Sequence, residues 1–415
     1  MKFVHAADLH LDSPLRGLEA YKDDGAPVER IREATRQALC NLVELCLAER
    51  ADFLLLCGDV FDDDWRDFHT GLFFMGQLMR LAEANISVYL VRGNHDSVSE
   101  ITRNLKWPAH VKEFSSHSPE TTVREDLGVA LHGRSFPRRA VAESWVAAYP
   151  APRRGLINIG LLHTSAAGST EHPTYAPCSL DELAAKGYEY WALGHVHQHQ
   201  ILHKSPWVVF SGNTQGRHAN ECGAKGCVIV EADHGEIVDV RHVPLDVVRW
   251  QRIDLVTQDS DDLDDLLARV DRRLREEIAA AEGRLLAVRL NIAGACAAHE
   301  DVVRQRAKVI SELRSLTFAG DVWLEHVSLA TRPRVRLDEL RAGEGFVGEL
   351  LRTIEAVRGD PTALAVLGDE LKPLREKLAA ELGSLGIDVS SPTYLREVLG
   401  EAEAALVCRL VGAPP

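Results

Sequence analysis

The sequence predicts an α/β protein built as a sandwich of two β-sheets flanked by helices, followed by a small α+β domain and a helical C-terminal region. Three observations predict this architecture. Strand and helix patterns alternate over the first 100 residues, strands become denser from about residue 110 to 245, and only helical patterns remain after Pro333. The chain has 415 residues, which corresponds to two or three domains of about 100–200 residues each. The expected domains are 1–245, 246–334 and 335–415.

The composition is that of an ordinary globular protein. Apolar residues make up 46% of the chain and charged residues 26%, which excludes a disordered or fibrous chain. The 47 lysines and arginines against 62 aspartates and glutamates give a net charge of −15, which argues against nonspecific coating of nucleic acid. The apolar runs are far shorter than the ~20 residues of a membrane-spanning helix. Because His5 and Asp8 also interrupt any signal-peptide core, we expect a soluble protein that does not bind membranes.

The eight cysteines contain no C-x-x-C pair. A chain of this length does not need disulfides to stabilise its core, so we expect free thiols in a reducing compartment. Cys222 and Cys227 flank a turn, but no neighbouring His or Cys completes a zinc site. These features favour a cytoplasmic location.

The first 100 residues alternate between buried strands and amphipathic helices. In residues 28–49, apolar side chains recur three and four positions apart, which is the helical period. The run DFLLLC at 52–57 is continuously apolar after Asp52 and ends at Gly58, as expected for a strand that is buried on both faces. Strands separated by helices imply crossover connections and a mainly parallel sheet. The expected strands are 2–7, 52–57 and 87–91, and the expected helices are 28–49 and 68–84.

Strand patterns predominate between residues 110 and 245, which indicates a second sheet packed on the first. The stretch 248–332 then follows the order strand, helix, strand, helix, strand, which is a compact α+β module. Helical patterns at 370–382 and 394–410 account for much of the C-terminal region. The expected strands before residue 245 are 129–132, 156–162, 190–193, 207–210 and 226–231.

Aspartate, histidine and asparagine side chains follow five of the expected strands at their ends. In open α/β sheets, ligands bind beyond the carboxyl ends of the strands, so these side chains should meet in one place. Residues two apart in an extended chain point the same way, and glycines at positions 58, 93 and 194 allow tight turns after the strands. The side chains are those of Asp8 and His10, Asp59, Asn94 with His95 and Asp96, His163, and His195 with His197.

This set offers nitrogen and oxygen ligands and no sulfur. Carboxylates and imidazoles suit Mn²⁺, Fe²⁺ or Zn²⁺ better than a thiolate zinc site would. Without His95 and Asp96, the set offers seven ligands: two carboxylates, one amide oxygen and four imidazoles. Seven ligands are too many for one tetrahedral ion but fit two ions that share a bridging carboxylate. Two ions roughly 3.5–4 Å apart clamp the attacking and leaving oxygens of a phosphoryl displacement and lower the pKa of bound water toward ~7. The sequence therefore predicts a dinuclear metal site.

The order D-x-H, G-D, G-N-H-D, His and G-H-x-H resembles the signature of the calcineurin-like metallophosphoesterases. The similarity extends to HAADLHLDSPL at 5–15, GDVFD at 58–62 and SGNTQGRH at 211–218. These segments resemble the bacterial DNA-repair exonucleases related to the SbcD nuclease subunit, especially the YhaO-like branch. The motifs cover roughly residues 1–245, and the module at 248–332 occupies the place of the family's DNA-capping domain.

The resemblance implies a role for each motif residue. Asp8, His10 and His197 would hold one ion, Asn94, His163 and His195 would hold the other, and Asp59 would bridge them. His95 would stabilise or protonate the leaving oxygen, and Asp96 would orient His95. A metal-bound hydroxide would attack the phosphodiester without a protein nucleophile. Some relatives carry a histidine shortly after the Gly-Asp motif, where this chain has Asp62.

The family implies a DNA exonuclease or endonuclease of DNA repair that uses two divalent ions, most suitably Mn²⁺, with Fe²⁺ or Zn²⁺ as alternatives. Two other functions stay open. One is a metallophosphatase or cyclic-nucleotide phosphodiesterase with the same site, and the other is a non-catalytic scaffold subunit of a repair complex. The long region beyond residue 245 favours the nuclease, and the intact ligand set speaks against the scaffold.

Partners are implied by the same resemblance. The family's nuclease subunits work with a coiled-coil ATPase of the SbcC or SMC type, usually as homodimers, and the helical region 335–415 is the expected docking element. Contacts to the DNA backbone are expected from Arg134, Arg217 and His218. His132, Arg138 and Arg139 could also reach the DNA backbone, with solvation at the surface as the alternative.

Overall fold

The computed structural model describes residues 1–13, 27–62, 68–97, 106–166, 175–317, 321–333, 337–378, 382 and 388–410. The chain forms two compact units. The first comprises Met1–Ile253, Arg273–Leu290 and Arg314–His326, and the second comprises Asp254–Arg272, Asn291–Leu313 and Val327–Pro415.

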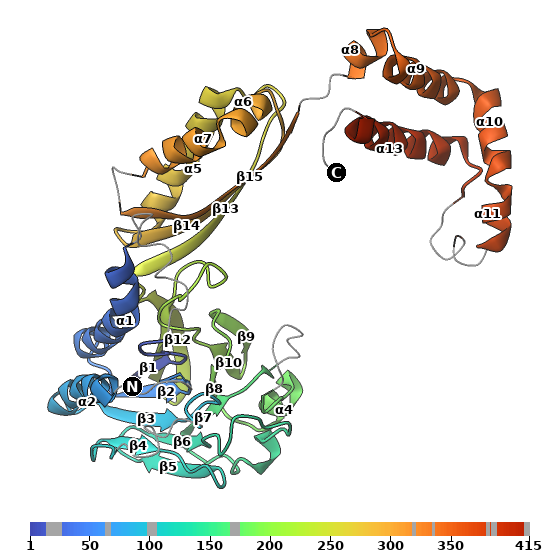
Figure 1. The fold of residues 1–415 in the computed structure, drawn as a ribbon. Helices are drawn as coiled ribbons and strands as arrows, with labels where there is room; N and C mark the ends of the chain where they lie inside the picture. Colours follow the sequence, from blue (N-terminus) through green and yellow to red (C-terminus); the bar gives the residue numbers. More distant parts are fainter. Residues whose placement is uncertain are drawn as a thin grey trace. The chain divides into compact units, whose positions relative to one another are not determined.

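The first unit contains a six-stranded sheet of order β12-β11-β1-β2-β3-β4 (Figure 1). Strands β1 to β4 are parallel, whereas β11 and β12 are antiparallel to their neighbours. Helices α1 (Val28–Ala48) and α2 (Phe68–Glu83) pack on one face and bury Leu39, Leu42, Phe74 and Leu78 against it. The strands are β1 (Lys2–Ala6), β2 (Phe53–Cys57), β3 (Ser87–Val91), β4 (Val111–Glu113), β11 (Gly226–Asp233) and β12 (Glu236–Pro244).

A second six-stranded sheet has the order β5-β6-β7-β8-β10-β9. Strands β6, β7, β8 and β10 are parallel to one another, and β5 and β9 form the two edges, each antiparallel to its neighbour. Its outer face packs on η2 (Val146–Ala148) and α4 (Leu180–Ala185) through Trp145, Tyr149 and Trp191. The strands are β5 (Glu120–Arg124), β6 (Val129–Gly133), β7 (Ile157–His163), β8 (Tyr190–Gly194), β9 (Gln200–Lys204) and β10 (Trp207–Phe210).

The two sheets pack face to face over an apolar core. Alternate side chains of β2 explain why this strand is apolar at every position: Phe53 and Leu55 face the other sheet, and Leu54 faces the helices. The ring of Phe3 stacks on Phe53 at 5.0 Å and meets Tyr190 of the second sheet edge-on at 5.4 Å. The predicted two-sheet α/β sandwich flanked by helices is therefore confirmed.

Four strands were not expected from the sequence: β4, β5, β9 and β12. They lie at the edges of the sheets. Strands β5, β9 and β12 are largely exposed or half-buried, so their sequences carry little apolar alternation. The expected strand 156–162 is shifted by one residue, so that His163 ends β7 instead of following it.

The rest of the chain follows the expected order of elements. A third sheet of order β13-β14-β15 is formed by β13 (Val248–Val256), β14 (Leu285–Cys296) and β15 (Val322–Pro333). The helices between these strands are α5 (Leu263–Ala280), α6 (His299–Arg304) and α7 (Arg306–Ser315).

The C-terminal region is helical, as predicted. Its helices are α8 (Leu337–Ala342), α9 (Phe346–Gly359), α10 (Pro361–Glu370), α11 (Lys372–Lys377) and α13 (Pro392–Leu410). The expected helix at 370–382 is wrong in its bounds. Because proline lacks an N–H and suits only the first turn of a helix, Pro373 separates α10 from the short α11. In the described ranges, no helix combines the length and the apolar character needed to cross a membrane.

Candidate metal centre

The side chains expected at strand ends meet at one edge of the sandwich. Asp8, Asp59 and Asn94 follow β1, β2 and β3 of the first sheet, and His163, His195 and His197 end or follow β7 and β8 of the second. The sheets approach closely here, since a Cβ on Gly194 would overlap the Cys57 carbonyl oxygen. Only glycine permits this approach, which brings ligands from both sheets together.

The ligand loops have an unusual backbone. Asp8, His10, Asp59 and His195 have φ values of 52°, 43°, 52° and 103°. Non-glycine residues rarely occupy this left-handed region, and such strain concentrates at functional sites. Gly58, with φ of 92°, precedes Asp59 and makes the same turn without a steric penalty.

The first cluster consists of Asp8, His10 and His197, whose ligand atoms lie within 4.8 Å of one another. The Nδ1 atom of His10 lies 2.5 Å from Asp62 Oδ1, and that of His197 lies 2.6 Å from Glu221 Oε1. Each carboxylate fixes the proton on Nδ1, so both Nε2 atoms carry lone pairs. These two Nε2 atoms are 3.2 Å apart. Two facing lone pairs beside the Asp8 carboxylate repel one another unless a cation lies between them, so this cluster fits a metal ion.

The second cluster consists of Asp59, His163 and His195. The Nδ1 atom of His163 lies 2.9 Å from the Cys57 carbonyl oxygen, and Nε2 lies 3.0 Å from Asn94 Oδ1 and 3.3 Å from Asp59 Oδ2. In the neutral ring Nδ1 donates to Cys57, which leaves Nε2 facing only acceptors. Burial lowers the pKa of His163, but the Asp59 carboxylate outweighs burial and raises it to about 9. Either a proton or a cation resolves the conflict among these acceptors, and the donor set fits a divalent cation.

Two buried carboxylates support the histidines of the first cluster from behind. Glu221 accepts hydrogen bonds from His197 and Arg217 on Oε1, and from Asn213 Nδ2 at 3.0 Å and the Arg217 N–H at 2.8 Å on Oε2. The Arg217 guanidinium also lies 3.7 Å from Asp62. Burial would raise the pKa of Glu221, but the hydrogen bond from His197 and the charge of Arg217 hold it below its usual range.

Sequence reasoning did not single out Glu221, and it treated Asp62 only as a departure from some relatives. A signal for both was available, because a metal-ligating histidine usually donates its other N–H to a carboxylate. Asp62 lies three residues after Asp59, and Glu221 lies four residues after Arg217. Each is therefore close to a residue that the motifs already mark.

His95 and Asp96 lie at the site but are not paired as expected. Both Asp96 oxygens accept backbone N–H groups, from Gly93 at 3.0 Å, Phe61 at 3.0 Å and Val60 at 3.2 Å. Asp96 therefore ties the loop after β3 to the loop after β2. Burial and the charge of Asp59 raise the pKa of Asp96 to about 6.

The His95 ring lies near the first cluster. It meets the His10 ring edge-on at 5.2 Å, and its Nδ1 atom is 3.7 Å from Asp62 Oδ1. The His95 backbone N–H donates to Asp59 Oδ1 at 2.9 Å. The carboxylate near the His95 ring is thus Asp62, which corrects the expectation that Asp96 orients this ring.

The expected DNA contacts lie in different environments. The expectation that His132 could reach the DNA backbone is wrong, because this residue is fully buried and its ring nitrogens form hydrogen bonds with Thr121 and Asn158. The Arg217 side chain is only 16% exposed and is paired with Glu221, whereas His218 is 57% exposed. The Arg134 side chain is half-buried, its guanidinium lies 4.0 Å above the Trp145 ring in a cation–π contact, and its Nε atom is buried without a hydrogen-bond partner.

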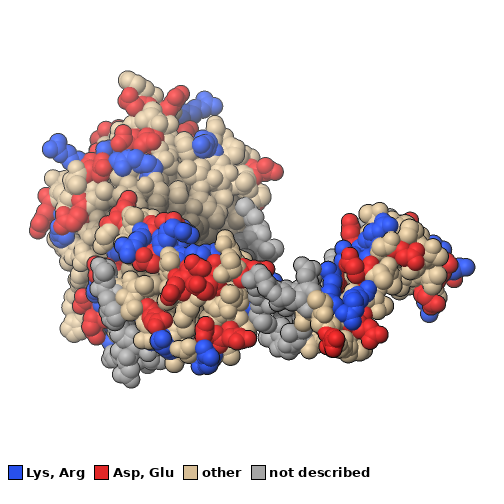
Figure 2. Space-filling view, turned by 90° about the horizontal axis from the view of Figure 1, so that it is seen from above, with Lys and Arg blue, Asp and Glu red and all other residues tan. Residues whose placement is uncertain are grey.

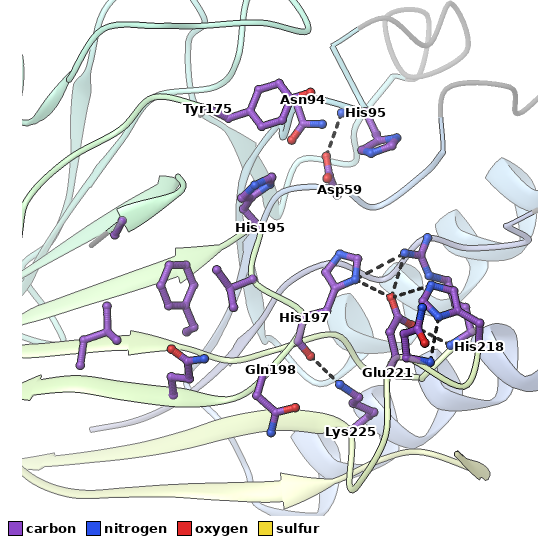
Figure 3. A pocket seen from close by; sticks show the side chains of 17 residues that line it. Asp59, Asn94, His95, Tyr175, His195, His197, Gln198, His218, Glu221 and Lys225 are labelled. Atoms are coloured by element: carbon purple, nitrogen blue, oxygen red, sulfur yellow. Dashed lines mark hydrogen bonds and ion pairs between the residues drawn. The ribbon is translucent and has the colours of Figure 1, made fainter. Parts of the chain in front are cut away.

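A cavity of about 780 Å³ opens over both clusters. Figure 3 shows Asp59, Asn94, His95, His195 and His197 around it, and the Tyr175 ring meets the His195 ring edge-on at 5.2 Å. Volumes of roughly 300–1,000 Å³ are typical of sites for whole small molecules. The cavity is therefore much larger than a single phosphate group needs.

Comparison with known proteins places this fold and site in a family. Residues 1–199 match the family described as calcineurin-like phosphoesterase, and residues 250–332 match the middle domain of the metallophosphoesterase YhaO. Residues 1–199 therefore form a calcineurin-like metallophosphoesterase domain, and the two matches together make the chain YhaO-like, as its motifs predicted. A domain of this fold implies bound divalent metal ions, and the chain has clusters of ligands that suit them.

Three relatives illustrate the range of similarity. The chain is 39% identical to YhaO of Bacillus subtilis over 242 residues, which cover 57% of this chain and 59% of YhaO. It is 24% identical over 285 residues to the DNA double-strand break repair protein Mre11 of Methanopyrus kandleri, covering 61% of this chain and 58% of that one. The SbcD component of the nuclease SbcCD of Escherichia coli is 23% identical over 289 residues, with 60% and 69% covered. The matched segments thus span less than two thirds of the first two relatives.

Proposed function

We propose that this protein hydrolyses phosphodiester bonds in DNA as an exonuclease or endonuclease of DNA repair. The observation that carries this proposal is the joint opening of both ligand clusters into a cavity of about 780 Å³, which accommodates a nucleotide rather than a phosphate alone. Similarity to proteins named for DNA double-strand break repair and for nuclease activity supports the same substrate.

The two clusters are proposed to hold two divalent ions. The ligands of one ion are Asp8, His10 and His197, those of the other are Asn94, His163 and His195, and Asp59 is shared. Asp59 suits this role because its carboxylate interacts electrostatically with both His163 and His10. Mn²⁺ matches the mixed carboxylate, amide and imidazole donors, and such ions supply Lewis-acid activation of water and of the phosphate.

The protein's own acid is proposed to be His95. It lines the cavity, its backbone is fixed by Asp59, and its ring lies near Asp62. From this place the imidazole can donate a proton to the leaving oxygen while remaining off the metal ligand clusters. Asp62 then orients both His10 and His95.

The test compares substrates on the same metal-reconstituted protein. End-labelled linear duplex DNA, single-stranded DNA, a cyclic dinucleotide and a phosphate monoester are incubated in parallel with Mn²⁺. We expect cleavage of DNA, lost in His95→Ala with unchanged Mn²⁺ binding measured by calorimetry. Cleavage of the cyclic dinucleotide or the monoester alone would favour the phosphodiesterase or phosphatase alternative. Absence of any hydrolysis by the metal-loaded protein would favour the scaffold.

DNA binding is proposed to depend on local cations. Figure 2 shows basic and acidic side chains in small mixed groups on the face that it displays, in keeping with the net charge of −15. The candidates are His218, whose side chain is 57% exposed, and Arg134, whose side chain is half-buried. Because contacts between cations and phosphates release counterions, the affinity for DNA should fall steeply with salt.

A coiled-coil ATPase of the SbcC type is proposed as the partner, with the helical region as its docking element and a homodimer as the assembly. The relative named for its place in the nuclease SbcCD supports such a complex. Leu351 and Ile354 are buried within this region, so the contacts must come from exposed apolar side chains such as Phe346 and Val366, which are 70% and 59% exposed.

Substitution of the exposed side chains tests the docking surface. Phe346→Asp with Val366→Asp should abolish co-purification with the ATPase and spare DNA cleavage. The matched control is Val238→Asp, which changes a side chain of the first unit that is 60% exposed. Equal association of both variants would contradict this surface.

The described cysteines are all free, which supports the proposed cytoplasmic location.

A further inference from the structure

We propose that one face of the β9–β10 hairpin is a nucleobase subsite, which binds the base of the nucleotide next to the cleaved phosphate. This subsite rests on the proposed phosphodiesterase function and names its substrate class: a strand in which this base is unpaired.

Strand pairing and packing place three side chains on the same face of the hairpin. Gln200 lies directly opposite Phe210 in the antiparallel register, and residues directly opposite one another share a face. The register shifts between Val208 and Val209, so Leu202 has no partner in the ladder, but its side chain packs against the core cluster that contains Phe210. All three side chains line the cavity. Ile201 lies between Gln200 and Leu202 and does not line it.

This face continues directly into the metal centre. Val196 lies between the ligands His195 and His197, lines the same cavity and packs, like Leu202, against the core that contains Phe210. The segment is held in place by Lys225, whose Nζ atom donates to the His197 carbonyl oxygen at 2.8 Å. The ligands His195 and His197 thus lie on the same continuous segment, 195–202, as most of the wall, and Figure 3 shows Gln198 next to His197 in this segment.

The chemistry of the wall matches an uncharged planar group. The side chains at this end of the cavity are apolar or amides: Val196, Gln198, Gln200, Leu202 and Phe210. The cationic side chains that line the cavity belong to the loop at 217–225 instead. A phosphate would bind at the cationic loop and the metals, whereas a base needs an apolar surface for its face and amide groups for its edge. Since a paired base stays stacked in a duplex, the subsite selects a frayed end or a single strand.

The test uses two esters that share one leaving group. Thymidine 5′-(p-nitrophenyl phosphate) carries a base, and ethyl p-nitrophenyl phosphate does not. Release of p-nitrophenol by the Mn²⁺-loaded full-length protein gives kcat/KM for each. We expect the nucleoside ester to be preferred by at least about tenfold, the order of discrimination that an apolar pocket provides.

Two substitutions of equal bulk locate the subsite. Leu202→Trp fills the cavity face, and Ile201→Trp adds the same group to the opposite face, where Ile201 is 37% exposed. Leu202→Trp should raise KM for the nucleoside ester and bring the preference close to one, whereas Ile201→Trp should keep it. Gln200→Ala, at an exposed position, should weaken the preference in the same direction and serves if Leu202→Trp fails to fold.

The outcomes separate the subsite from the reaction. A preference that is absent in the wild type, or is equal in Leu202→Trp and Ile201→Trp, overturns the subsite while leaving phosphodiester hydrolysis in place. If neither ester is hydrolysed, the DNA cleavage test decides the proposed function, and calorimetry with thymidine 5′-monophosphate against ribose 5-phosphate decides the subsite. Tighter binding of the nucleotide that Leu202→Trp removes and Ile201→Trp retains supports it. Equal binding of the two ligands overturns it.

Discussion

Asp62 and Glu221 are the outer carboxylates of this site, since each accepts a hydrogen bond from the Nδ1 atom of a histidine ligand. Replacing Glu221 by glutamine tests whether the outer carboxylates set the metal affinity. Four donors converge on the two Glu221 oxygens, from His197, Asn213 and both the side chain and the backbone of Arg217. Glutamine keeps the shape but has one oxygen and one NH₂ group, so in either orientation two of the four donors meet another donor. If the NH₂ group faces His197, the ring must carry its proton on Nε2 and cannot bind metal through that atom.

The expected magnitude follows from these contacts. Loss of a carboxylate behind a histidine ligand typically weakens metal affinity by about 10- to 100-fold, which corresponds to about 1.4–2.8 kcal/mol. Because Glu221 and Asn213 are buried and His197 and Arg217 are half-buried, the two unsatisfied donors should also lower the free energy of unfolding of the metal-free protein by about 1–3 kcal/mol. Both effects should appear in Glu221→Gln.

The assay is titration of the metal-free protein with Mn²⁺ in a calorimeter, combined with urea unfolding. The control is Glu44→Gln, since Glu44 also pairs with an arginine, at 2.6 Å from Arg80, but is 63% exposed. That surface pair should contribute about 0–1 kcal/mol and leave metal affinity unchanged. A Glu221→Gln protein that binds Mn²⁺ within about threefold of the wild type would refute the reasoning that outer carboxylates fix the His197 tautomer.

Three other outcomes are expected. Burial lowers the pKa of His132 to about 4, so the stability that its neutral ring contributes is complete above pH 6.5 and is lost as the pH falls toward 4. In urea unfolding, this loss should lower the free energy of unfolding by about 1–2 kcal/mol between pH 7 and pH 5, and His132→Gln should lack it. Gly194→Ala should lower the free energy of unfolding by about 3 kcal/mol, because the new Cβ would meet the Cys57 carbonyl oxygen. The control Gly76→Ala in α2, with open space around it, should raise the free energy of unfolding by up to about 1 kcal/mol. Equal effects of the two substitutions would contradict the close approach of the sheets. Mn²⁺ at about 100 times its Kd should stabilise the protein by about 2.7 kcal/mol, which is measured as a rise in Tm. A chelator should reverse this rise, and Asp59→Asn should diminish it. A Tm that is insensitive to Mn²⁺ would contradict the metal site.

The placement of the expected ligands was predictable because it depends on backbone topology. Each of Asp59, Asn94 and His163 ends or follows a strand that is recognisable from a continuous apolar run, and parallel strands deliver their carboxyl ends to one edge. The pattern of strands and the pattern of ligands therefore support one another in the sequence. The edge strand β9 carries no such signal because its side chains are mostly exposed.

The pairing of side chains behind the ligands was not predictable in the same way. Arg217 was expected to reach DNA, but the chain turns so that Glu221 and Asp62 surround its guanidinium. Asp96 was assigned to His95 through the family resemblance, yet neighbouring residues of a turn point to different sides, and Asp96 satisfies three backbone N–H groups instead. The spacing to the motifs marks Asp62 and Glu221 as candidates, but tertiary packing decides which carboxylate faces which ring.

The strained backbone of the ligand loops explains how the site keeps its geometry. A left-handed conformation costs roughly 1–2 kcal/mol at a non-glycine residue, and Asp8, His10, Asp59 and His195 all adopt it. The loops hold one another in this state: the Asp8 N–H donates to Gly58 O at 2.9 Å, the His10 N–H to Asp59 O at 3.0 Å, and the His195 N–H to Asp8 Oδ2 at 2.9 Å. Since each ligand's backbone is fixed by another ligand's loop, the arrangement is formed by the folding of the two sheets together. A change in one loop should therefore displace ligands in both clusters, whereas a change in an outer carboxylate should alter affinity without moving the backbone.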